Sequence, residues 1–230
     1  MPQLTLTVLS LRYSSWSMRP WLALTHAGAD FRTKTVVLES FETTTLAERR
    51  RLGSVSGLFP VLRVDDEPIH ESLAICEYAA EAFADAGLWP EGALDRARAR
   101  AICSEMVGDF AAMRSEMSCH LFARAPKLRP SDNARANIDR VFEIWTGSLD
   151  RSGGPFLFGS VSIADFFYYP VLTRLRTYGI GLPGSLETYA RSVETLPAVE
   201  ALARKARTEP PNAIYDDYIL KLGGDPQAVL

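Results

Sequence analysis

Segments with the pattern of β-strands occur only in the first third of this 230-residue chain. They are rich in Val, Leu, Thr and Phe and cover residues 4–11, 31–38, 59–64 and 68–70. Helical patterns alternate with them at residues 17–27, 41–52 and 72–86. The resulting order, β-α-β-α-β-β-α, predicts a region of mixed α and β structure.

Beyond this region the strand patterns stop. Residues 87–92, Gly-Leu-Trp-Pro-Glu-Gly, break the pattern, and only helical periodicity follows. The predicted helices cover residues 95–121, 133–149, 162–178, 186–193 and 197–207. The sequence therefore predicts two domains, an α/β domain of residues 1–86 and an all-helical domain of residues 93–230.

The composition excludes several classes of protein. Apolar residues make up 47% of the chain and the net charge is -3, so no basic surface for nucleic acid or an anionic membrane is expected. Three cysteines and three histidines lie far apart, which argues against a disulfide framework and a metal site. They are Cys76, Cys103, Cys119, His26, His70 and His120.

No targeting or membrane segment is expected. The first residues lack the basic region and small-residue cleavage site of a signal peptide. No apolar run approaches the roughly 18 residues that cross a bilayer. A cytoplasmic location is the expectation.

The first candidate motif is the polar turn between the first strand and the first helix. Ser14 and Ser15 lie beside the positive end of that helix, where a hydroxyl could stabilise an anion. Serine is also a preferred helix cap, and on this segment alone capping is the favoured interpretation. Ser17 is the better capping candidate, which places Pro20 in the first helical turn and leaves Ser14 and Ser15 without a capping role.

Two further motifs flank the last two strands. Pro60 begins the third strand after Phe59, and from the residues alone an ordinary trans proline at a strand edge is favoured. Glu71 and Ser72 precede a helix and could simply cap it. The same pair could also bind a peptide with charges at one end, with Ser72 and the helix N-terminus facing a carboxylate and Glu71 facing an ammonium group.

A fourth motif lies in the helical half. Ser162 and Asp165 have the Ser-x-x-acid spacing of a capping box, in which each side chain satisfies the other residue's backbone N–H. This role is structural and says nothing about a substrate.

Together, the element order and these motifs resemble the cytosolic glutathione transferases over nearly the whole chain, from Leu6 to about Arg207. That family has a thioredoxin-like α/β N-terminal domain and an all-α C-terminal domain. The turn Tyr-Ser-Ser-Trp-Ser-Met-Arg-Pro-Trp is similar to the Ser-Ser-Cys-x-x-Arg motif of the zeta class, and closer to a bacterial group with Tyr-Ser-Ser-Trp-Ser-x-Arg-Pro-Trp. Trp16 stands where zeta enzymes have cysteine, which makes maleylacetoacetate isomerisation less expected.

The resemblance implies roles for individual residues. It makes Ser14 the catalytic hydroxyl of a serine-type enzyme, although the choice between Ser14 and Ser15 rests on the resemblance alone. It implies a cis bond between Phe59 and Pro60 and a glutathione site. The glutathione-binding residues would be Ser14, Ser15, Phe59, Pro60, Glu71 and Ser72. Glutathione would be the co-substrate, without a metal, and the protein would be a homodimer.

An electrophile pocket is expected between the domains, lined by Trp16, Phe110, Met113, Arg114 and Met117. The apolar members are more typical of plain core. Arg114 could meet an anionic substrate or form an interdomain salt bridge. The function expected is attack of a glutathione thiolate on a small hydrophobic electrophile. The alternatives are a glutathione-dependent isomerase or peroxidase, or a non-catalytic protein that binds glutathione or hydrophobic ligands.

Overall fold

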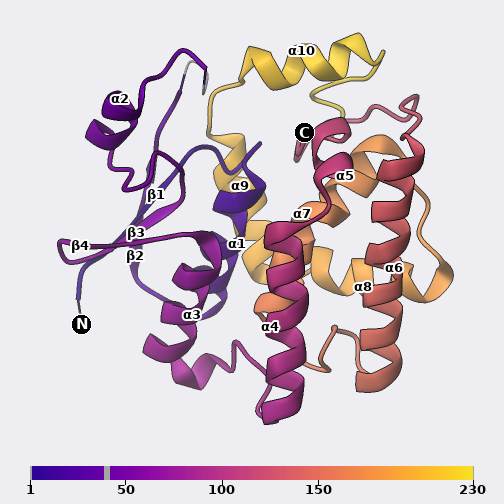
Figure 1. The fold of residues 1–230 in the computed structure, drawn as a ribbon, viewed down its shortest axis with the longest axis horizontal. Helices are drawn as coiled ribbons and strands as arrows, with labels where there is room; N and C mark the ends of the chain where they lie inside the picture. The colour runs from indigo at the N-terminus through magenta and orange to yellow at the C-terminus, as the bar shows by residue number, and fades with distance from the viewer. Residues whose placement is uncertain (1, 39–41, 230) are drawn as a thin grey trace.

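The computed structural model describes residues 2–38 and 42–229. Its sheet has four strands in the order β2-β1-β3-β4 (Figure 1). Strand β1 pairs in parallel with β2 and antiparallel with β3, which in turn pairs antiparallel with β4. The strands are β1 (Leu4–Val8), β2 (Phe31–Thr35), β3 (Val61–Val64) and β4 (Glu67–His70). The α/β domain predicted from the sequence is confirmed, with shorter strands.

Three helices and one 3-10 turn complete this part of the chain. They are α1 (Ser15–His26), α2 (Leu46–Arg51), α3 (Ser72–Ala82) and η1 (Ala84–Ala86). The predicted helix over residues 41–52 is wrong at its start, because Thr45 and Glu48 form a capping box that begins α2 at Leu46. Residue 41, where that prediction began, lies outside the described residues.

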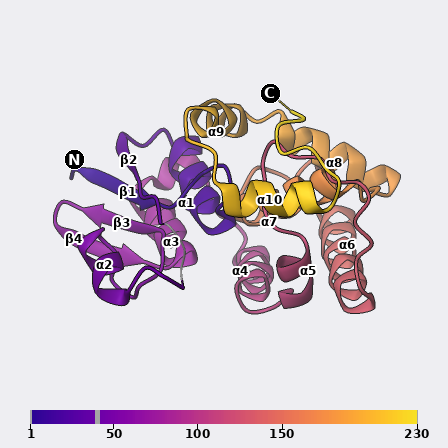
Figure 2. The same cartoon turned by 90° about the horizontal axis from the view of Figure 1, so that it is seen from above.

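The rest of the chain is helical, as predicted. The helices are α4 (Ala93–Gly108), α5 (Ala111–Glu116), α6 (Asp132–Ser152), α7 (Ile163–Tyr178), α8 (Gly184–Glu194), α9 (Pro197–Arg207) and α10 (Ala213–Lys221). Helix α10 has no counterpart among the predicted elements. Figure 2 shows it extending from the side of the α/β domain across the helical domain.

The single helix predicted over residues 95–121 is instead two helices. Helix α4 ends at Gly108, and Phe110 adopts a left-handed backbone conformation with φ of 63°. This conformation costs about 1–3 kcal/mol in a residue other than glycine. It leaves the Phe110 ring only 3% exposed, and burial of such a ring contributes about 1.5–3 kcal/mol. The two terms are of similar size, so packing of the ring can hold the break.

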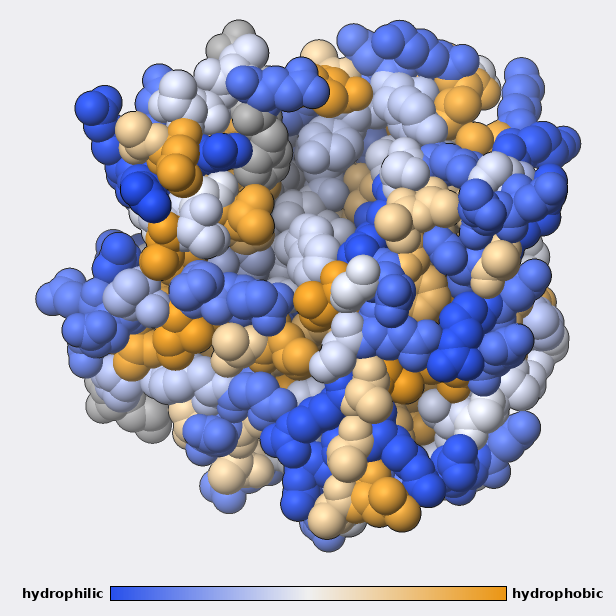
Figure 3. Space-filling model, viewed as in Figure 1, coloured by the Kyte–Doolittle hydropathy of each residue, from blue (hydrophilic) through white to orange (hydrophobic). Residues whose placement is uncertain are grey.

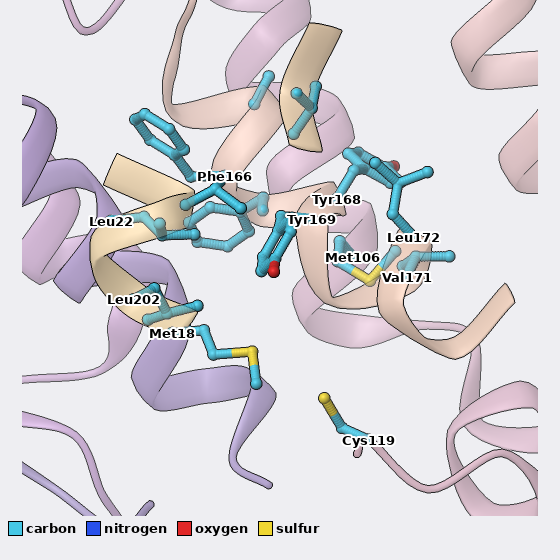
Figure 4. Packing of buried hydrophobic residues seen from close by; sticks show 14 of the residues in the cluster. Met18, Leu22, Met106, Cys119, Phe166, Tyr168, Tyr169, Val171, Leu172 and Leu202 are labelled. Atoms are coloured by element: carbon cyan, nitrogen blue, oxygen red, sulfur yellow. The ribbon is translucent and has the colours of Figure 1, made fainter. Parts of the chain in front are cut away.

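One apolar core joins the two domains. Helix α7 lies at its centre, with 15 of its 16 residues buried. In Figure 4, Leu22 of α1 lies beside Phe166 of α7, and Met18 lies near Leu202 of α9. The predicted capping box at the start of α7 is present, with the buried Asp165 carboxylate accepting from the Ser162 N–H at 2.8 Å. This packing fixes the β1–α1 turn relative to the helical domain.

Within residues 2–38 and 42–229, no helix is both long and apolar enough to cross a membrane. The same residues contain no group of three or more His, Cys, Asp or Glu side chains placed to hold a metal ion.

Candidate glutathione and electrophile site

Ser14 is the N-cap of α1. Its Oγ accepts a hydrogen bond from the Ser17 N–H at 3.3 Å, and its own N–H donates to the Ser10 carbonyl at 2.8 Å. The prediction that Ser17 caps this helix is wrong, and Pro20 consequently falls in the second helical turn. Among the described residues, the Ser14 hydroxyl donates to no partner, so its hydrogen is available to a ligand.

The neighbouring Ser15 is buried and bonded to helix α7. It is 6% exposed, and its Oγ accepts from Nη2 of Arg174 at 3.4 Å, across 159 positions of sequence. Ser14, by contrast, is half-buried and lines a cavity of about 520 Å³. Only the first serine therefore presents its hydroxyl to open space.

That cavity has three walls. The β1–α1 turn supplies the first wall, the segment that follows β2 supplies the second, and the residues that enter α10 supply the third. Its lining residues are Leu9, Ser10, Tyr13, Ser14, Thr35, Val36, Val37, Leu38, Glu42, Glu209, Pro210, Pro211, Asn212, Ala213, Ile214 and Tyr215. Figure 3 shows a hollow in the upper middle of the surface that faces the viewer.

The peptide bond between Phe59 and Pro60 is cis. The resemblance implied this geometry, whereas the residues alone favoured trans. Phe59 is 6% exposed and packs with Val36 and Val61 in a small apolar cluster.

Glu71 caps α3 with its own carboxylate. The carboxylate accepts from the backbone N–H groups of Leu73 at 2.8 Å and Ala74 at 3.3 Å, and from the hydroxyl of Ser72 at 2.9 Å. Glu71 itself has a positive φ of 77°, and Ser72 is 1% exposed. The helix N-terminus therefore binds a carboxylate in this structure, and that carboxylate belongs to Glu71.

Three arginine side chains gather beside Trp16 and Ser15. The guanidinium carbon of Arg19 lies 4.4 Å from the centre of the Trp16 ring, and that of Arg114 lies 5.4 Å from it. Arg174 completes the group through its bond to Ser15. We call these three residues the arginine cluster. Among the described residues, none of its members forms an ion pair with a carboxylate.

Arg19 is the most buried member of the cluster. It is 1% exposed, and its Nε and Nη1 have no hydrogen-bond partner among the described residues. Burial, followed by the charges of Arg174 and Arg114, lowers its pKa to about 9. Burial is also the main cause of the lowered pKa of Arg114. A buried group of like charges without counterions favours an anion nearby.

The residues proposed for an electrophile pocket do not line the cavity at Ser14. Phe110, Met113 and Met117 are at most 3% exposed and belong to the apolar core. Trp16 and Arg114 are half-buried and contact each other. Their role in substrate binding stays a prediction.

Two domain models of one family match this chain. Residues 13–82 match "Glutathione S-transferase, N-terminal domain", and residues 106–205 match "Glutathione S-transferase, C-terminal domain". Together the matches cover about three quarters of the chain. The chain belongs to the glutathione transferase family.

Curated relatives of this glutathione transferase family member carry a more specific name. This chain is 37% identical to a maleylacetoacetate isomerase of Rhizobium meliloti over 97 residues. The matched segment covers 42% of this chain and 45% of the relative. The chain is 28% identical over 147 residues to a maleylacetoacetate isomerase of Dictyostelium discoideum, which is 56% of this chain and 67% of the relative. The chain thus matches less than half of the Rhizobium protein's length.

Solved structures agree on the fold. A glutathione transferase homologue from Burkholderia, with bound glutathione, superposes with a TM-score of 0.70 at 23% identity, covering 90% of this chain and 100% of its own. A tau class glutathione S-transferase from mango gives 0.66 at 21% identity, covering 89% and 96% of the two chains. These similarities establish the thioredoxin-like domain followed by a helical domain.

Two parts of this site were not predicted from the sequence, namely Arg174 and the cavity wall at residues 209–215. Arg174 lies in α7, far along the chain from Ser15, and nothing in its local pattern separates it from other helix arginines. The wall at residues 209–215 had a signal, because Pro210 and Pro211 end one helix and begin a new apolar stretch.

Proposed function

We propose that this protein is a glutathione transferase in which the Ser14 hydroxyl activates the glutathione thiol for attack on a small hydrophobic electrophile. The main support for this proposal is the position of Ser14. It lies at the α1 N-terminus and lines a cavity, and its hydroxyl hydrogen is donated to no described residue. Ser14 donates this hydrogen to the sulfur and removes no proton itself, because serine is a poor base. The thiol proton passes to water. The thiolate sulfur then bonds to the electrophile, and the electron pair of the attacked bond moves to the leaving group or to the adjacent atom.

The available energy is of the required size. Bringing a thiol pKa from its alkaline value to near neutrality takes about two units, or roughly 2.7 kcal/mol. One hydrogen bond to a charged sulfur supplies about 1.5–3 kcal/mol, and a helix N-terminus about 0.3–1 kcal/mol. The arginine cluster beside Ser15 acts in the same direction, since positive charge favours the thiolate.

The remaining glutathione contacts follow from the same arrangement. We assign the peptide backbone of glutathione to Phe59 and Pro60, and its γ-glutamyl carboxylate to Ser72 and the α3 N-terminus. Ser15 is left out of this assignment, because it is buried and its hydroxyl oxygen is bonded to Arg174. The Glu71 carboxylate must leave the α3 N-terminus when that ligand enters, and it then faces the ligand's ammonium group.

A glutathione-dependent isomerase is the second candidate. The arginine cluster favours it, because three cations without carboxylate partners would suit an anionic substrate. The curated relatives are named for such an activity. Trp16, in the place of the zeta-class cysteine, opposes it. Parallel assays with a neutral electrophile and with maleylacetoacetate separate the two candidates.

The test of the serine mechanism is the pH titration of thiolate absorbance for bound glutathione. Ser14→Ala should raise the thiol pKa by about 1–2 units, because it removes a charge-assisted hydrogen bond. Ser14→Thr keeps a hydroxyl and should stay close to wild type, and Ser15→Ala is the matched control. A thiol pKa in Ser14→Ala equal to that of wild type would refute the mechanism. It would support a protein that binds glutathione without activating it.

A further inference from the structure

The turn that precedes Ser14 is held by residues from the far end of the chain. We call residues 209–226 the C-terminal arm. Glu209 is 7% exposed, and its Oε2 accepts from the Ser10 hydroxyl at 2.6 Å and from the Arg12 N–H at 3.3 Å. Its Oε1 accepts from the Thr35 hydroxyl at 3.2 Å. Arg12 also donates from Nη2 to the Pro226 carbonyl at 3.4 Å. The arm therefore fixes the first part of the turn.

The second part of the turn is fixed through Tyr13, which is 3% exposed. Its hydroxyl donates to Oδ1 of Asp216 at 2.9 Å and accepts from the Asn212 N–H at 3.0 Å. Its ring stacks on Tyr215, with centroids 4.7 Å apart and an interplanar angle of 17°. Three residues of the arm thus surround the side chain immediately before Ser14.

His120 supports the same carboxylate from the helical domain. Its Nε2 lies 2.8 Å from Oδ1 of Asp216, and its Nδ1 accepts from the Phe122 N–H at 3.4 Å. A neutral ring with its proton on Nε2 satisfies both bonds. Burial lowers the pKa of His120, which favours that neutral form.

The arm contributes little to the apolar core. Ile219 is the only buried residue of α10, and Ile214 and Leu220 are each 55% exposed. Its polar contacts connect two parts of the molecule. Some go to the turn before Ser14, and others go to the helical domain, where the Tyr218 hydroxyl donates to the Glu116 carbonyl at 2.6 Å and Asp225 pairs through its backbone with Arg124. Because the arm buries little apolar surface, these polar contacts are its main connection, and they link the turn to the helical domain.

We propose that the C-terminal arm positions Ser14, with Tyr13 and Asp216 as positioning residues that act through the β1–α1 turn. The Ser14 N–H is bonded to the Ser10 carbonyl, so displacement of either end of the turn moves the hydroxyl. The arm also forms one wall of the cavity that Ser14 lines. This inference rests on the proposed role of Ser14.

The experiment measures the thiol pKa of bound glutathione, by thiolate absorbance against pH, together with kcat/KM at neutral pH. Asp216→Ala and Tyr13→Phe should raise that pKa by about 0.5–1 unit and lower kcat/KM about 3–10-fold. Asp216→Asn should restore near-wild-type values, since the amide oxygen accepts the same two hydrogen bonds. Asp217→Ala is the matched control, because it removes an exposed carboxylate from the same helix.

The outcomes distinguish the positioning role of the arm from the serine mechanism itself. If Ser14→Ala raises the thiol pKa and Asp216→Ala and Tyr13→Phe do not, the positioning role is wrong and the serine mechanism stands. An equal effect of Asp217→Ala would also overturn it, since loss of charge would explain the shift. If Ser14→Ala itself has no effect, both proposals fail. Should Asp216→Ala not fold, Tyr13→Phe carries the test, because it keeps the stacked ring.

Discussion

Replacement of Glu71 tests how the α3 N-terminus exchanges one carboxylate for another. In the free protein this side chain accepts from two backbone N–H groups and from the Ser72 hydroxyl. In the proposed complex the γ-glutamyl carboxylate takes these donors, and Glu71 turns to the ammonium group. Glu71→Ala removes both the competing cap and the ammonium partner, and their effects on affinity have opposite signs.

The free energy of the competing cap and that of the ion pair with the ammonium group are similar in size. Losing the cap costs the free protein about 0.5–2 kcal/mol, typically about 1 kcal/mol, and wild type must give up the same amount when the ligand enters. The exposed ion pair with the ammonium contributes about 0.2–1 kcal/mol. With the typical cap value of about 1 kcal/mol, the affinity for glutathione should therefore change by less than about fourfold in Glu71→Ala.

A ligand without the ammonium group separates the terms. In glutaryl-cysteinylglycine, hydrogen replaces that group, so only relief of the competing cap remains. This ligand should bind Glu71→Ala about fivefold more tightly than wild type, which corresponds to about 1 kcal/mol. Titration calorimetry of both ligands against both proteins gives the four affinities.

Glu71→Gly provides the control. It removes the same carboxylate but relaxes the positive φ of 77°, so it should be about 1 kcal/mol more stable than Glu71→Ala. Both variants should give the same pattern of affinities. If glutaryl-cysteinylglycine binds wild type as tightly as it binds the variants, Glu71 does not compete for the helix end, and the reasoning is refuted.

Two further predictions concern stability. Asp165→Ala leaves the N–H groups of Leu157 and Ser162 without their buried acceptor, so the free energy of unfolding in urea should fall by about 2–4 kcal/mol. A loss below about 1 kcal/mol would contradict this. Burial lowers the pKa of His120, so below pH ~6.5 the unfolded chain takes up a proton that the folded protein resists. Stability should fall with decreasing pH, by at most about 1.4 kcal/mol per unit from this residue. His26 has the same direction of shift, so the contribution of His120 is the part lost in His120→Gln. If the free energy of unfolding depends on pH in the same way in wild type and His120→Gln, His120 makes no such contribution.

Periodicity was sufficient for the element types and for their order. The four strands and most helices could be predicted because each has a regular apolar spacing over several residues. The break at Phe110 could not, since it depends on where one ring finds space in the core. Helix α10 was missed for a different reason. Its apolar residues have helical spacing, at Ile214, Tyr215, Tyr218 and Ile219, but the helix has only nine residues and buries one of them, so the pattern is short.

The site was predictable only in part, because its residues come from distant segments. Glu71 and Ser72 were found through a local helix-start pattern, and their contacts are local. The bond from Arg174 to Ser15 joins positions 159 residues apart, and the bond from Tyr13 to Asp216 joins positions 203 residues apart. Neither partner has a local signal, so only the folded chain reveals them.

The structure also changes the choice that the sequence posed for Ser14, between helix cap and thiol activator. A hydroxyl group has two acceptor lone pairs and one donor hydrogen. The cap uses a lone pair, through the bond from the Ser17 N–H, whereas thiol activation would use the hydrogen. Accepting one hydrogen bond polarises the O–H and strengthens it as a donor. The capping bond would therefore both orient the Ser14 hydroxyl and improve it for the proposed reaction, so evidence for the cap is no argument against the activator.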